Sequence, residues 1–123
     1  MKISKYILIA IVISLAGCNA SNPKKNNVAS NNEVTYSGKS HASSRLKKDA
    51  LKTIKVVVGA KGCNKIDHIN SKIFHYEPSN GKKGHVWGKE GWLVTGCSKP
   101  YPFYLTFTED GKGGTFFSIK TKK

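Results

Sequence analysis

Residues 101–108, YPFYLTFT, alternate between large apolar side chains and other residues at every second position. The alternation places Tyr101, Phe103, Leu105 and Phe107 on one face, and Tyr104, Thr106 and Thr108 on the other. A period of two is typical of a β-strand that buries one face and exposes the other. We therefore predict a strand here, with its aromatic face in the core.

Three further segments predict strands around this one. The predicted strands cover residues 66–76, 85–96, 101–108 and 115–122. The first turn, between the first two strands, contains Asn80-Gly81, which is a common hairpin signal. Residues 110–114 are rich in glycine and predict the last turn. Consecutive strands joined by short connections favour an antiparallel meander.

An amphipathic helix precedes the predicted strands. Its apolar residues recur four apart, at Leu46, Ala50, Ile54 and Val58, with Leu51 and Val57 widening the stripe. Ser43 or Ser44 can cap its start, and Gly59 or Gly62 can end it. The β-branched run 56–58 is also compatible with a strand, so the end of the helix stays open. We expect an α+β fold in which one N-terminal helix packs on a four-stranded antiparallel β-meander with one disulfide.

The start of the chain has the layout of a secretory signal. Lys2 and Lys5 precede an apolar segment that ends in the run Leu15-Ala16-Gly17-Cys18. The segment is shorter than the ~20 apolar residues that a membrane-spanning helix needs. The run resembles the lipobox of bacterial lipoproteins. The resemblance implies cleavage before Cys18, a diacylglycerol on the Cys18 sulfur, and acylation of the new amino group, including by palmitate.

The same resemblance implies a location and a domain plan. In bacterial lipoproteins an aspartate directly after the cysteine favours retention in the inner membrane, and here that residue is Asn19. We therefore expect a lipid anchor in the outer membrane, facing the periplasm. The expected plan is a signal peptide over residues 1–17, an acylated cysteine with a disordered tether over 18–43, and a small α+β domain over 44–123.

The chain is strongly basic. It has 21 basic and 7 acidic residues, a formal net charge of +14, and removal of the signal peptide lowers this to about +12. Small soluble domains carry a net charge of magnitude about 2 to 8. Arg45 is the only arginine, which suits diffuse attraction rather than bidentate phosphate recognition. We expect an anionic lipid, lipopolysaccharide or cell-wall polymer as partner, or an envelope protein, but not a strongly basic lysozyme.

Two cysteines remain once the lipobox has used the first. Cys63 and Cys97 belong to no CxxC motif or Cys/His ligand cluster, and an exported protein meets an oxidising compartment. A hairpin centred on Asn80 places them opposite each other. We therefore predict a Cys63–Cys97 disulfide rather than catalytic or metal-binding thiols.

The histidines and carboxylates of the sequence form no recognisable catalytic or metal-binding motif. His75 and His85 fall near each other across the first turn, but Glu77 is the only nearby carboxylate, so we predict no metal and no cofactor. No GxSxG or HExxH motif is present. A small periplasmic hydrolase is a less favoured alternative, which a solvent-open cluster joining His68 or His85 to a carboxylate would support.

The aromatic residues offer a candidate ligand surface. Trp87 or Trp92, together with Tyr104, can form a stacking platform for sugars or bases if they lie on the open face of the sheet. Most other aromatic residues fit the core under the helix. The sequence therefore predicts a lipoprotein with a binding or assembly role at an anionic envelope surface. A carbohydrate- or nucleic-acid-binding module is the alternative, although no RNP-like motif supports base recognition.

Overall fold

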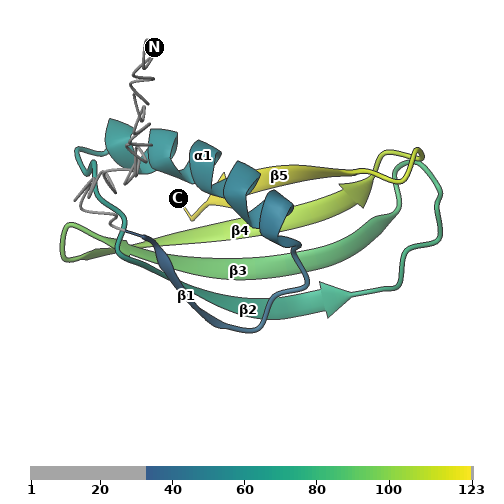
Figure 1. Cartoon of the computed structure of the whole chain (residues 1–123), viewed down its shortest axis with the longest axis horizontal. Coiled ribbons are helices and arrows are strands. Elements are labelled where there is room, and N and C mark those ends of the chain that lie inside the picture. The colour runs from purple at the N-terminus through teal and green to yellow at the C-terminus, as the bar shows by residue number, and fades with distance from the viewer. Residues whose placement is uncertain (1–32, 123) are drawn as a thin grey trace, which may run out of the picture.

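The computed structural model describes residues 33–122, which form one helix and a five-stranded sheet (Figure 1). The elements are β1 (Thr35–Gly38), α1 (Ser44–Ala60), β2 (His68–Tyr76), β3 (Val86–Gly96), β4 (Lys99–Glu109) and β5 (Thr115–Thr121). The strand order is β1-β2-β3-β4-β5. β1 runs parallel to β2 and the other pairs are antiparallel. The α+β class is therefore confirmed, and β2–β5 form consecutive antiparallel pairs within a sheet of five strands rather than four.

β1 corrects the predicted sheet and the predicted tether. It lies within residues 18–43, so the fold begins before Ser44, α1 is not the first element, and the sheet is mixed rather than wholly antiparallel. The strand has only four residues and weak apolar character. It is held by pairing with β2 and by a hydrogen bond of 3.1 Å from Thr35 N to the carbonyl of Asp67, the residue just before β2. The signal peptide and Cys18 lie outside the described residues.

α1 begins and ends as its sequence indicates. The hydroxyl of Ser43 caps the helix by accepting a hydrogen bond from Leu46 N at 3.2 Å. At the other end, Gly62 N donates to Gly59 O and Cys63 N donates to Val58 O, with Gly62 at a φ of 91°. This Schellman arrangement stops the helix after the valine run. None of the helical structure within residues 33–122 is long and apolar enough to cross a membrane.

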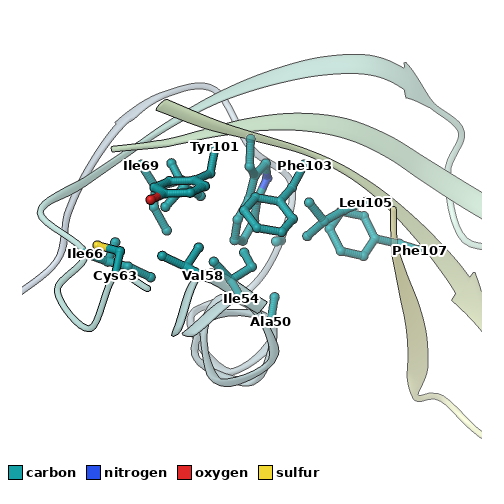
Figure 2. Close-up of a cluster of buried hydrophobic side chains, with 13 residues drawn as sticks. Ala50, Ile54, Val58, Cys63, Ile66, Ile69, Tyr101, Phe103, Leu105 and Phe107 are labelled. Carbon is teal, nitrogen blue, oxygen red and sulfur yellow. The ribbon is translucent and has the colours of Figure 1, made fainter. Parts of the chain in front are cut away.

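The core lies between α1 and one face of the sheet. Figure 2 shows Ala50, Ile54 and Val58 of the helix pointing toward Phe103 and Leu105 of the sheet. These side chains are buried, as are Tyr101 and Phe107 on the same face of β4. The other buried core residues are Ala42, Cys63, Ile66, Ile69, Trp92 and Val94. The predicted aromatic face of β4 is therefore the core face.

The Cys63–Cys97 disulfide is confirmed, with a Cα–Cα distance of 5.8 Å. The register that suggested it is wrong, because His68 pairs with Thr95 and the hairpin is centred between Gly81 and Lys82 rather than on Asn80. Cys63 lies before β2 begins, and Cys97 lies in the tight β3–β4 turn at a φ of 50°. The bond therefore joins the connection between α1 and β2 to the β3–β4 turn, and does not link two paired strand positions.

Candidate functional site

The face of the sheet opposite α1 has no helix over it, and we call it the open face. Its outward positions follow from the register and the buried alternate residues. They include Asn70, Lys72, Phe74, Lys89, Leu93, Pro102, Tyr104, Thr106, Phe116 and Lys120. Within the five strands that residues 33–122 form, the acidic residues are Glu90 and Glu109, and both are buried. The outward strand positions thus carry lysine without carboxylate.

Large apolar side chains are exposed on the open face. Phe74 is 56% exposed, Leu93 45%, Tyr104 44% and Phe116 61%. The rings of Phe74 and Tyr104 stack with their centroids 6.1 Å apart. A shallow groove of about 250 Å³ runs beside them. Phe74, Leu93 and Tyr104 line this groove together, whereas Phe116 lies opposite Thr108, four positions along β4 from Tyr104. Grouped exposed apolar side chains, unlike scattered ones, are typical of an interaction surface.

A β-bulge and a glycine lie at this aromatic platform. The β2–β3 register shifts between Ile73 and His75, which leaves Phe74 without a paired residue on β3, while its side chain continues the exposed alternation of Asn70 and Lys72. Its ring lies against Gly91, where a Cβ atom would collide with the ring. Gly91 therefore allows Phe74 to lie flat on the sheet beside Tyr104.

The exposed side of α1 is also basic, but unlike the open face it carries little apolar surface. Arg45, Lys48, Lys52 and Lys55 recur at helical spacing on the exposed side. Asp49 lies among them and forms an ion pair with Lys52 at 3.1 Å. Val56, at 72% exposure, is the single large apolar side chain exposed on the helix. The helix thus offers charge with little apolar surface.

The predicted platform of Trp87, Trp92 and Tyr104 does not form one surface. Trp92 is 1% exposed and belongs to the core, where its indole N–H donates to Glu90 Oε2 at 2.7 Å. Trp87 is half-buried on the helix side and stacks on Phe107 with centroids 4.9 Å apart. Tyr104 alone of the three lies exposed on the open face.

Glu90 is a buried carboxylate that the sequence pattern does not reveal. It is 1% exposed and points to the core side of β3. Besides the indole of Trp92, it accepts a hydrogen bond from the backbone N–H of His41 at 2.7 Å. Both oxygens are therefore occupied: Oε2 by the core indole of Trp92, and Oε1 by the connection between β1 and α1.

A second hollow lies on the helix side of the sheet. Its volume is about 340 Å³, and His41, Tyr76, Trp87 and Glu109 are among its lining residues. His41 and Tyr76 stack at a centroid distance of 3.8 Å. Glu109 accepts hydrogen bonds from the Ser79 hydroxyl and from Asn80 N. Its carboxylate thus holds the loop after β2, which makes its role structural.

Asp110 organises the turn between β4 and β5. Its Oδ1 accepts hydrogen bonds from Lys112 N at 2.6 Å and Gly114 N at 2.9 Å. These backbone donors lower the pKa of the Asp110 carboxyl, because they stabilise its ionised form. The acidic pair at positions 109 and 110 is therefore part of the turn architecture.

The histidines near the first turn gather around one carboxylate. Glu77 Oε1 lies 3.3 Å from His75 Nε2, and Glu77 Oε2 lies 3.9 Å from His85 Nε2. His85 Nε2 also lies 3.2 Å from Pro78 O. Residues 33–122 contain no group of three or more His, Cys, Asp or Glu side chains arranged to hold a metal ion.

Comparisons with known proteins leave the family open, since no family model, no curated protein and no solved structure matches this chain. A function must therefore be inferred from the side chains that the surfaces of the domain expose.

Proposed function

We propose that this protein is a lipid-anchored envelope lipoprotein whose domain docks on an anionic membrane surface through the open face. One observation carries the proposal. The open face combines four exposed apolar side chains with lysines, and its outward strand positions hold no carboxylate. The proposed anchor is an acyl group on Cys18, and the proposed site is the periplasmic side of the outer membrane.

The charge supports attraction to acidic headgroups. Lys72, Lys89 and Lys120 are exposed and occupy outward positions of three strands. A lysine close to an anionic membrane surface contributes about 1 kcal/mol. Three of them therefore contribute roughly 3 kcal/mol, and salt screens this attraction because the Debye length falls to about 10 Å at 0.1 M.

The apolar side chains support contact with the bilayer itself. Interfacial proteins bury apolar side chains at the boundary between headgroups and acyl chains. Phe74, Leu93 and Phe116 have no hydrogen-bonding group in their side chains, so they favour an apolar environment over a sugar hydroxyl. Flanking lysines can keep their ammonium groups among the headgroups while their methylenes cover apolar surface.

The arrangement favours a bilayer over a sugar or a nucleic acid. Both tryptophans, the strongest stacking side chains, lie on the helix side or in the core. Arg45, the only arginine, lies on α1 and is not available for bidentate phosphate contacts on the open face. A lipid anchor also raises the local concentration of the domain at the membrane, so docking can be weak and still persist.

A vesicle-binding experiment with two matched variants tests the proposal. The mature chain with Cys18→Ser carries no acyl group, so its binding reports the domain alone. In one variant Lys72, Lys89 and Lys120 become Gln, and in the other Lys48, Lys52 and Lys55 on α1 become Gln. Both lose the same charge.

We expect the open-face variant to bind phosphatidylglycerol vesicles about 100-fold more weakly, from three lysines at about 1 kcal/mol each. The helix variant should retain most of the binding. Equal losses of affinity in the two variants would contradict docking through the open face, because net charge alone would then account for the binding. Stronger binding to single-stranded DNA or to an anionic polysaccharide than to vesicles would contradict a membrane partner.

A further inference from the structure

Four polar side chains form a hydrogen-bonded chain where β1 meets β2. His68 Nδ1 lies 2.6 Å from Thr35 Oγ1, and His68 Nε2 lies 2.7 Å from Ser37 Oγ. Asn70 Nδ2 donates to Ser37 Oγ at 2.7 Å. This network thus places the imidazole of His68 and the amide of Asn70 each within hydrogen-bond distance of the Ser37 hydroxyl.

The partners of Thr35 determine the direction of these hydrogen bonds. Its hydroxyl donates to Asp67 O at 3.2 Å, so its oxygen is left to accept the Nδ1–H of His68. This tautomer leaves His68 Nε2 without a proton and able to accept the hydroxyl proton of Ser37. The network therefore orients the imidazole as a base toward Ser37, an assignment that follows from its partners.

The backbone holds Ser37 firmly in this position. The Ser71 hydroxyl donates to Ser37 O at 3.1 Å, and Lys39 N donates to Ser71 O at 3.0 Å. Between them, Gly38 has a φ of 81° and lies so close to the Ser71 carbonyl that a Cβ atom would not fit. The glycine thus permits the tight approach that brings Ser37 beside His68.

We propose that Ser37 is the nucleophile of an acyl-ester site, with His68 as its general base. Ser37 Oγ attacks the ester carbonyl carbon and its proton passes to His68 Nε2. Asn70 Nδ2 donates to the carbonyl oxygen as negative charge develops there. The bond to the alcohol oxygen then breaks, and the alcohol leaves with the proton from His68. Water then attacks the acyl-Ser37 ester and gives a proton to His68 Nε2. His68 passes this proton to Ser37 Oγ as the acyl bond breaks, and the carboxylic acid is released.

The surroundings of the serine indicate the substrate class. Asn70 also lines the shallow groove of the open face, together with Phe74 and Leu93, and Lys72 lies at the same groove. An apolar acyl chain can lie along these side chains with the ester at Asn70. The substrate class is therefore an ester of an apolar carboxylic acid. The proposal does not depend on membrane docking, because a soluble ester can reach the same groove.

Covalent labelling of the mature Cys18→Ser chain by a fluorophosphonate tests this site. The expected result is one adduct per chain, mapped to Ser37 by peptide mass spectrometry. Ser118, another serine at an outward strand position, serves as the matched control. Ser118→Ala should label like the parent protein, whereas Ser37→Ala should not label.

Three further variants separate chemistry from folding. His68→Gln should slow labelling by about 100-fold or more, the usual range for a general base. Thr35 is a positioning residue, so Thr35→Val should slow labelling and Thr35→Ser should restore it. Absence of a Ser37 adduct on the folded parent protein would overturn the proposal, whatever the variants do. That result would leave vesicle binding untouched, so the two proposals fail separately.

Discussion

Removal of the Cys63–Cys97 disulfide should destabilise the domain strongly. The bond closes a loop with a sequence separation of 34 residues. In the chain-entropy model, a loop of this length contributes about 3.8 kcal/mol at 25 °C. A domain of about 90 residues has a total free energy of unfolding of roughly 4.5 to 13 kcal/mol. The disulfide therefore supplies between a third and most of the expected stability.

The measurement is urea unfolding of the mature Cys18→Ser chain, followed by tryptophan fluorescence. Trp92 is buried and Trp87 is half-buried, so both indoles report the loss of tertiary structure. We expect the reduced protein to lose about 3 to 4 kcal/mol in free energy of unfolding. At 4 to 8 °C per kcal/mol for a small domain, the thermal midpoint should fall by roughly 15 to 30 °C.

The double variant Cys63→Ala and Cys97→Ala is the control for effects of the reductant. It should match the reduced parent protein, because both lack the same loop constraint. A loss below about 1 kcal/mol, with both thiols shown free by mass spectrometry, would refute the loop-entropy reasoning.

Three further predictions concern the anchor, the core and the last turn. Cys18→Ser should release the protein from membranes into the soluble fraction, as immunoblotting of fractionated cells would show; undiminished firm attachment would contradict the anchor. Glu90→Gln should cost about 1 to 3 kcal/mol in urea unfolding, because its amide N–H group must face a buried N–H donor; an unchanged midpoint would contradict the assigned role. The lowered pKa of Asp110 gives stability that is present above the unfolded pKa of about 3.9 and is lost as the pH falls through the folded pKa. Asp110→Asn should therefore lose less stability than the parent between about pH 5 and pH 2, and parallel losses would count against this.

The elements with a strong local pattern could be predicted from the sequence. The alternation around Phe103 and Phe107 gave both the strand and its buried face, and the four-residue spacing from Leu46 gave the helix. These patterns work because burial on one side of an element leaves a period in the sequence. Ser43 as the helix cap follows from the same local chemistry.

β1 could not be predicted, because its stability comes from a distant partner. Its residues pair in parallel with β2, more than 30 positions away, and its side chains bond to His68 and Asn70. The register of β2 and β3 was also out of reach, since bulges at Phe74 and Trp87 shift the pairing without a local signal.

The candidate surface depends on that register. Leu93 stands between Trp92 and Val94, so the sequence does not show which of these apolar side chains faces outward. The structure puts Trp92 and Val94 in the core and leaves Leu93 exposed. Sequence reasoning could identify Tyr104 from the clean alternation of β4, but not its neighbours Phe74 and Leu93.

The orientation of the domain on a vesicle is the most direct test of membrane docking. An environment-sensitive fluorophore would be attached through Leu93→Cys on the open face or through Lys52→Cys on α1, each in the Cys18→Ser chain. With phosphatidylglycerol vesicles, the fluorophore at position 93 should shift to the blue and be quenched by lipids spin-labelled near the headgroup, while the one at position 52 stays in water. A blue shift at position 52 with none at position 93 would contradict docking through the open face.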